Sequence, residues 1–414
     1  MINELKKEVE EKYGKKVENR GDCEKISNAI LELLDTEISY NTIRRLFKLA
    51  PYTNPNKKTL NTLAKFVGYR NYFHFTQTYS NKEKTQLYRL TYKHIYLDDD
   101  LKIINLIKNT RNSTDDFVDF ITLVVRELFY LKKYELIDSI FKLEELEYSR
   151  FSYTEILYFG NSVGLMLRKE NKINEVLAKN INFLKWVYLI FVDYSSLNSY
   201  YGKWAKTLKD LKTTSEIKVF NLAILEFKRF LNNKDLKNNV EELIYNKNLH
   251  PILCSRLIAL YLLSKNVSSP IEALTKYCKF YPKTEYFTDY FYELFTTSIL
   301  TKNIGVMKFI IHKINFKIMH LYQKEHLNSY YLMSAFYYKL TSNKVEQSSN
   351  YNRFNLDECR SSYEEFLKII NLIYVYDIAV DRTEKKQILK QYKLLSEKLK
   401  YPYFSKELLL DYFK

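Results

Sequence analysis

The chain has 414 residues and a mass of 49.9 kDa, which is long for one ordinary domain and enough for two or three. Only 7 residues are glycine and 6 are proline, while 16% are aromatic. Sandwiches, barrels and doubly wound sheets need frequent turn glycines and prolines, and disordered chains lack aromatics, so we expect an all-α fold. The formal net charge of +16 favours a polyanionic partner, although a surface rich in lysine explains it equally well.

The first 80 residues differ from the rest in the pattern of their charges. Residues 1–37 carry ten acids and seven bases, whereas residues 38–80 carry seven bases and no acid. A segment of that length with the average composition of this chain would hold about five acids. We therefore expect residues 1–80 to form a small domain with a basic half, and residues 81–414 to form a second domain.

Two amphipathic helices are predicted in the acidic part. Residues 2–13 have apolar side chains at helical spacing, and Gly14 is expected to end that helix. A second helix is expected to begin with Asp22 as its N-cap. A turn over residues 34–38 then leads into the basic part.

Two more helices, and a short final one, are predicted in the basic part. Ser39 is expected to cap a helix over residues 40–49. A loop with two prolines separates it from a helix that starts at about Lys57 or Thr59 and ends at Gly68. The aromatic residues 72–75 are expected to form only a short helix.

Residues 39–46 and 59–68 resemble the helix-turn-helix of the lambda-repressor and Cro type. In SYNTIRRL a capping serine precedes a Thr-x-x-Arg helix, and TLNTLAKFVG is similar to that family's Thr-Leu-x-x-Leu-Ala-x-x-x-Gly. The resemblance covers about residues 1–80 and implies binding of double-stranded DNA through the helix that follows Ser39. The chain departs from the family's pattern in a longer second helix and turn, a longer loop before the fourth helix, and residues 48–51 in place of the usual glycine.

The resemblance makes ten side chains candidates for DNA contact. Asn41 can pair with adenine, and Arg44 or Arg45 with guanine, if this helix enters the major groove. Phosphate contacts are expected at the start of the helix and from nearby lysines. An ordinary solvated helix face is the alternative interpretation for each residue. The candidates are Ser39, Tyr40, Asn41, Thr42, Arg44, Arg45, Lys48, Lys57, Lys58 and Lys65.

From residue 81 onward, apolar helical segments alternate with polar breaks at roughly 35–45 residues per pair, a period typical of helical-hairpin solenoids. Residues 259–282, with Tyr261, Ala273, Tyr277 and Pro282, resemble a tetratricopeptide unit. We therefore expect a degenerate tetratricopeptide-like array over residues 81–414. The combination resembles peptide-sensing transcriptional regulators, which implies a peptide or protein ligand on the repeats and a homodimer.

Residues 198–206 and 342–358 differ from the rest of this array in composition. Residues 198–206, with the sequence NSYYGKWAK, resemble a nucleic-acid stacking patch, but core aromatics beside exposed lysines are the favoured interpretation. The polar residues 342–358 are expected to form a long surface loop.

The sequence offers little support for catalysis. It contains neither a glycine-rich phosphate loop nor an HExxH motif, and its four cysteines lie far apart. His312, His320 and His326 have no acid at ligand spacing, and Asp98–Asp100 are expected to cap a helix. We expect a protein that is not an enzyme and that binds neither a metal nor another cofactor.

A cytoplasmic protein without a membrane partner is expected, since the chain shows no secretory signal and no apolar stretch long enough to span a bilayer. The sequence thus predicts a DNA-binding transcriptional regulator whose repeat domain binds a peptide or protein, dimerises, or both. The alternative is a non-enzymatic interaction scaffold whose N-terminal helices dock protein. The lack of acids in residues 38–80 favours DNA binding.

Overall fold

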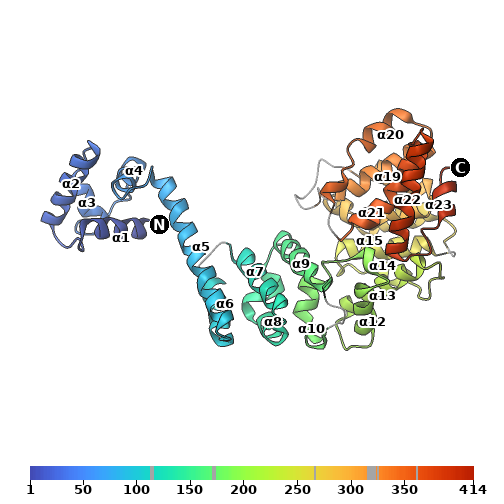
Figure 1. The fold of residues 1–414 in the computed structure, drawn as a ribbon, viewed down its shortest axis with the longest axis horizontal. Coiled ribbons are helices and arrows are strands. Elements are labelled where there is room, and N and C mark those ends of the chain that lie inside the picture. The colour runs from blue at the N-terminus through green and yellow to red at the C-terminus, as the bar shows by residue number, and fades with distance from the viewer. Residues whose placement is uncertain (112–115, 170–173, 265–266, 315–322, 324–325, 360–361) are drawn as a thin grey trace. The chain divides into compact units, whose positions relative to one another are not determined.

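The computed structural model describes residues 1–111, 116–169, 174–264, 267–314, 323, 326–359 and 362–414. Within these ranges the backbone forms helices and connecting loops, with no β-strand (Figure 1). The all-α class expected from the composition is therefore confirmed. The chain divides into two compact units, Met1–Leu106 (unit 1) and Ile107–Lys414 (unit 2).

Unit 1 starts with four short helices, followed by a long one. Its core is formed by side chains of all five, among them Leu5, Ile26, Ile43, Leu63 and Phe75, each at most 1% exposed. The final helix runs far beyond the short one that was predicted, so residue 80 lies inside it. The helices are α1 (Ile2–Tyr13), α2 (Arg20–Leu34), α3 (Tyr40–Leu46), α4 (Lys57–Phe66) and α5 (Tyr72–Tyr96), and the division between units falls within α6 (Asp100–Arg111).

Local capping explains most of these boundaries. Gly14 ends α1 and Gly68 follows α4, both with a left-handed backbone, at φ of 87° and 100°. Asp99 Oδ1 accepts a hydrogen bond from the backbone N–H of Lys102, as expected for an aspartate that caps α6. Gly14, Gly68 and Asp99 therefore lie at helix ends, as the sequence predicted.

The N-cap of α2 is Asn19, and the expectation of Asp22 at that position was wrong. Asn19 Oδ1 accepts the Asp22 N–H at 3.0 Å, and Asp22 Oδ2 accepts the Asn19 N–H at 3.2 Å, which makes a reciprocal capping box. Asp22 also pairs with Lys15 at 2.6 Å and accepts from the Tyr13 hydroxyl at 3.1 Å. These donors, Lys15 first, lower the pKa of Asp22 to about 2. Asp22 thus ties the end of α1 to the start of α2.

The described part of unit 2 consists of helices joined by turns and loops. Its α-helices are α7 (Phe117–Tyr130), α8 (Tyr134–Phe141), α9 (Tyr153–Leu167), α10 (Glu175–Lys179), α11 (Ile181–Phe183), α12 (Tyr200–Lys209), α13 (Ser215–Leu231), α14 (Glu241–Ile244), α15 (Pro251–Leu263), α16 (Pro270–Phe280), α17 (Phe287–Leu300), α18 (Ile304–Lys313), α19 (Leu327–Leu340), α20 (Lys344–Tyr351), α21 (Glu364–Ile378), α22 (Arg382–Leu399) and α23 (Lys406–Asp411). A π-helix, η3 (Leu184–Tyr188), follows α11. The 3-10 turns are η1 (Glu144–Leu146), η2 (Tyr148–Arg150), η4 (Tyr194–Ser196), η5 (Thr284–Tyr286) and η7 (Leu356–Glu358).

Helices in the second half of unit 2 pack against the next helix but one. Helix α13 contacts α15, α15 contacts α17, α17 contacts α19, and α19 contacts α21. Every residue of α17 from Thr288 to Leu300 is buried, so α17 is surrounded by protein on all sides. Within the described part of the chain, no helix is both long and apolar enough to cross a membrane.

The prediction for residues 198–206 is confirmed, and the one for residues 342–358 is not. Tyr201 and Trp204 are buried within α12, which confirms that residues 198–206 contribute aromatics to the core. The long loop expected over residues 342–358 was wrong, because α20 and η7 occupy most of it. Asn343 caps α20 by accepting the Glu346 N–H, and the helix packs on α19. Helix α20 is mostly polar, so its sequence lacks the apolar periodicity that predicts a helix.

Candidate nucleic-acid interface and aromatic cleft

Helix α3, the candidate DNA-contacting helix, is anchored to unit 1 by its apolar side. Ile43 and Leu46 are buried, and α3 packs on α2. Ser39 caps the helix as predicted, since its Oγ accepts the Asn41 N–H at 3.3 Å. The opposite side carries the exposed side chains of Asn41 and Arg45. Helix α3 therefore presents a polar surface on a rigid support.

Asn41 and Arg44, two of the candidate base-contacting residues, contact each other. Arg44 Nη1 donates to Asn41 Oδ1 at 3.2 Å. An amide oxygen has two lone pairs, so Asn41 can accept from Arg44 and from a base while its amide N–H groups donate. The hydrogen bond restricts both side chains before any partner arrives, which reduces the entropy lost on binding.

Tyr40 is less exposed than its position on the predicted outer face suggested. It packs partly against the core of unit 1, and its ring centre lies 4.9 Å from the guanidinium carbon of Arg20. Arg20 also pairs with Glu24 at 2.7 Å. The fold thus brings a base from the acidic part of the sequence next to α3. Counting charges by segment could not reveal Arg20, because its proximity comes from the packing of α2 on α3.

A pair of lysines lies at the C-terminal end of α3. Lys48 has a left-handed backbone with φ of 61°; its N–H bonds to Arg45 O at 3.2 Å, and the Leu49 N–H bonds to Arg44 O at 2.8 Å. Lys6 Nζ lies 5.2 Å from the centre of the Phe47 ring. Burial, and then the charge of Lys48, lower the pKa of Lys6. Lys6 adds a second base beside Lys48 that sequence reasoning had missed.

Helix α4 exposes the other three candidate lysines, Lys57, Lys58 and Lys65. Lys58 and Lys65 are seven residues apart and share one face of the helix. The described residues show neither a hydrogen bond nor a ring contact between the candidate side chains of α3 and those of α4. Nor do they show an ion pair for any base of residues 38–80, whereas Lys15 and Arg20 in the acidic part are paired.

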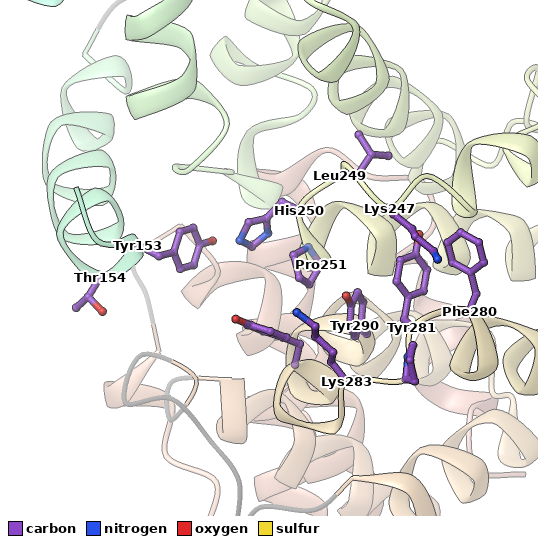
Figure 2. Close-up of a pocket in the computed structure, with 12 residues that line it drawn as sticks. Tyr153, Thr154, Lys247, Leu249, His250, Pro251, Phe280, Tyr281, Lys283 and Tyr290 are labelled. Carbon is purple, nitrogen blue, oxygen red and sulfur yellow. The ribbon is translucent and has the colours of Figure 1, made fainter. Parts of the chain in front are cut away.

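Unit 2 contains a cleft of about 850 Å³ lined mainly by aromatic, proline and lysine side chains (Figure 2). We call it the aromatic cleft. Its lining comes from the start of α9, from the segment that enters α15, and from the end of α16 through η5 into α17. The lining residues are Tyr153, Thr154, Lys247, Leu249, His250, Pro251, Phe280, Tyr281, Pro282, Lys283, Tyr286 and Tyr290.

The rings of the aromatic cleft are packed against one another in two groups. Tyr153 points from α9 toward His250 in Figure 2, and their ring centres are 4.5 Å apart in a stacked arrangement. Tyr281 stacks on Tyr290 at 4.7 Å and meets Phe280 edge to face at 4.7 Å. The rings are thus held in place for contact with an apolar ligand group.

Two lysines add positive charge to this aromatic lining. Lys247 Nζ lies 5.2 Å from the centre of the Phe280 ring, and Lys283 Nζ lies 6.0 Å from that of Tyr286. Each ammonium group can pair with a carboxylate of a ligand whose apolar part contacts the rings. The cleft is therefore suited to a ligand that is both apolar and acidic.

The titratable groups around the cleft have structural roles. His250 Nδ1 accepts the Ile252 N–H at 3.2 Å and so caps α15, and burial lowers the pKa of His250 to about 4. Burial raises the pKa of Cys254 to about 11, so its thiol is a poor nucleophile at neutral pH. Within the described residues, no cluster of three or more His, Cys, Asp or Glu side chains could hold a metal ion.

His312 and His326, two of the three candidate histidines, have different local partners. His312 Nδ1 lies 2.7 Å from the carbonyl oxygen of Lys308 in its own helix. His326 is buried, stacks on Tyr292 with 4.0 Å between ring centres, and lies 3.2 Å from Asp289. His320 lies outside the described residues.

Comparisons with protein-family models, with curated proteins and with solved structures find no significant match to this chain. Its function must therefore be inferred from its own chemistry. Unit 1 has an acid-free basic segment with polar helix surfaces, and unit 2 has a preformed aromatic cleft with two lysines.

Proposed function

We propose that this protein is a DNA-binding transcriptional regulator and that unit 1 binds double-stranded DNA through α3. The observation that carries the proposal is the acid-free segment of residues 38–80, whose exposed bases have no ion-pair partner among the described residues. Uncompensated positive charge attracts the phosphate backbone and supplies most of the affinity for DNA.

The packing of α2 on α3 supports a helix-turn-helix arrangement. In this arrangement Asn41 and Arg44 contact base edges, and Arg45 contacts a base or phosphate. Ser39 and Thr42, at the start of α3, contact phosphate. The lysines at the end of α3 and on α4, Lys48, Lys57, Lys58 and Lys65, contact the flanking backbone.

We also propose that unit 2 is a tetratricopeptide-like repeat domain that binds a peptide or a protein segment in the aromatic cleft. The packing of α13 on α15, of α15 on α17, of α17 on α19 and of α19 on α21 supports the repeat interpretation. The rings favour an apolar or aromatic residue of the ligand, and Lys247 and Lys283 favour an acidic group or a terminal carboxylate.

A second copy of the chain is a further proposed partner. One unit 1 can make only a few base contacts, and joining two of them raises the affinity for a site with two halves. Tyr96, Leu97 and Leu101 are 85%, 63% and 78% exposed and offer apolar surface for such a contact. Light scattering after size exclusion should give the mass of a dimer, and Leu97→Ser with Leu101→Ser should shift it toward the monomer.

The decisive experiment is a titration of the full chain with fluorescent random-sequence duplex over a series of salt concentrations. We expect affinity to fall steeply with salt, and Arg44→Ala with Arg45→Ala to weaken binding by roughly tenfold or more. The control is Lys386→Ala with Lys390→Ala, which removes the same charge from exposed positions of α22 and should change affinity less than about twofold. No binding near physiological salt, or equal weakening by both pairs, would favour the protein-docking scaffold.

A further inference from the structure

A second cleft in unit 2, of about 690 Å³, lies beside α12 and α13, and we call it the basic cleft. Among the described residues that line it, seven are basic and one is acidic. Helix α12 contributes Lys206 and Lys209, and the loop after α13 contributes Lys234 and Lys237. Helix α13 contributes the other three bases. This excess of positive charge is concentrated at one site and is far larger than the average over the chain.

Hydrogen bonds from α13 hold the loop of the basic cleft in place. The acidic residue, Glu226, is buried, and its carboxylate accepts the Lys237 N–H at 2.8 Å and the Asn238 Nδ2–H at 2.5 Å. Arg229 Nε donates to the carbonyl oxygen of Asp235 at 2.9 Å. Glu226 therefore serves to fix the loop, and it offsets only one of the seven positive charges.

Lys228 brings a positive charge into the interior of the cleft. Its side chain is half-buried, and a Cβ added to Gly202 of α12 would lie only 2.9 Å from its Nζ. Burial, followed by the charges of Lys206 and Lys234, lowers the pKa of Lys228. Ammonium groups from α12, α13 and the loop are thus close enough to repel one another. An anion bound among them would remove this repulsion.

The lining indicates what kind of anion fits. No aromatic side chain lines the cleft within the described residues, since Tyr201 and Trp204 of α12 are buried in the core. The cleft therefore lacks the rings on which nucleic-acid bases stack. Several bases in a small volume instead match a compact ligand with more than one negative group.

We propose that the basic cleft binds a small anion with two or more linked phosphate groups. Inorganic polyphosphates and nucleoside polyphosphates share this chemistry. The site is remote in sequence from α3 and α4, and the proposal does not depend on DNA binding by unit 1. It assigns to unit 2 a ligand different from the one proposed for the aromatic cleft.

Isothermal titration of the full chain with orthophosphate, pyrophosphate and tripolyphosphate tests this assignment. Affinity should rise along that series, and Lys206→Gln with Lys234→Gln should weaken tripolyphosphate binding by about tenfold or more. The control is Lys203→Gln with Lys212→Gln, which removes the same charge from exposed positions in and just after α12 that do not line the cleft. This control should change the affinity for tripolyphosphate less than about twofold. The cleft variant should still bind duplex DNA as the unmodified chain does.

A stability measurement provides an independent test. Lys228→Met keeps most of the buried stem but removes the charge, so the ligand-free variant should melt at or above the temperature of the unmodified chain. Tripolyphosphate should raise the melting temperature of the unmodified chain by more than it raises that of the variant. Titration with ATP distinguishes inorganic polyphosphates from nucleoside polyphosphates as the ligand. Equal affinity for ATP and tripolyphosphate indicates recognition of phosphates alone. Tighter binding of ATP indicates a nucleoside polyphosphate.

Three results would overturn the proposal. Orthophosphate could bind as tightly as tripolyphosphate, or both lysine pairs could weaken binding equally, which would indicate diffuse attraction to a basic protein. A single-stranded oligonucleotide could also bind more tightly than tripolyphosphate and lose affinity in Lys206→Gln with Lys234→Gln, which would make the cleft a nucleic-acid site.

Discussion

Arg256 and Glu293 form an ion pair of 2.6 Å inside unit 2, where their side chains are 5% and 6% exposed. Arg256 lies on α15 and Glu293 on α17, two helices that pack extensively against each other. The hydroxyls of Tyr194 and Tyr363 donate to the same carboxylate at 2.8 and 3.1 Å, and Arg256 Nε donates to Tyr194 Oη at 2.6 Å. Four segments of unit 2 thus meet around the buried carboxylate of Glu293.

Removing one partner of this pair should be costly. Glu293→Leu leaves the Arg256 guanidinium buried without its carboxylate and should lower the free energy of unfolding by about 3–5 kcal/mol. Arg256→Met with Glu293→Leu should cost less than the sum of the two single changes, because neither charge then remains. Both tryptophans of the chain, Trp186 and Trp204, lie in unit 2, so their fluorescence during urea unfolding measures this unit. Additive effects would show that the pair is not coupled.

The stability of unit 2 should fall between about pH 6.5 and pH 4. Burial, with smaller effects from the charges of His326 and Arg256, outweighs the attraction of Asp289 and lowers the pKa of His250 from 6.5 to about 4. The unfolded chain then binds a proton that the folded chain excludes, so the stabilisation present above pH 6.5 is lost as pH falls, by up to about 3 kcal/mol.

His250→Asn is the matched variant for this prediction, because asparagine can still cap α15 but does not titrate. Urea unfolding followed by tryptophan fluorescence at pH 7, 5.5 and 4.5 should give a shallower pH dependence for the variant than for the unmodified chain. Identical slopes would assign the acid sensitivity to other groups.

The left-handed backbone at Lys48 should make glycine the more stabilising residue there. Lys48→Gly should raise the stability of unit 1 by about 1 kcal/mol relative to Lys48→Ala, since only glycine adopts φ of 61° without steric cost. Both variants lose the same charge and should weaken duplex binding equally. Hydrogen exchange of the α2 and α3 amides in the full chain measures the difference in stability of unit 1. Faster exchange in Lys48→Gly than in Lys48→Ala would contradict the expected stabilisation by glycine.

Gly164 should not tolerate a larger side chain. It lies on α9, which packs on η3, and a Cβ at this position would lie 2.2 Å from the Phe191 side chain. Gly164→Ala should therefore destabilise unit 2 by about 1–3 kcal/mol. Gly305→Ala on α18 is the control, because its nearest neighbours would be 3.6 Å away and alanine favours a helix. Thermal melts followed by tryptophan fluorescence should separate the two variants, and equal melting temperatures would show that α9 can shift to accept the methyl group.

Local features of the candidate DNA site were open to prediction from the sequence. The Ser39 cap, the chain reversal at Gly14 and Gly68, and the start of α4, expected at about Lys57 or Thr59, each depend on residues within a few positions of one another. The full length of α5 was missed because apolar periodicity weakens after residue 80. Arg20 and Lys6 were missed because α1 and α2 bring them next to α3 only after folding.

The sequence by itself determined the all-α class, several helix ends of unit 1 and the lack of acids in residues 38–80, because composition and capping act through neighbours along the chain. The tertiary structure alone decided which charges meet. The Arg256–Glu293 pair and the lysines around Lys228 join segments from different helices. The rings of the aromatic cleft come from α9, from the segment that enters α15, and from the end of α16 through η5 into α17. Such contacts depend on how the helices pack. No local sequence pattern predicts a contact between side chains that are far apart in the chain.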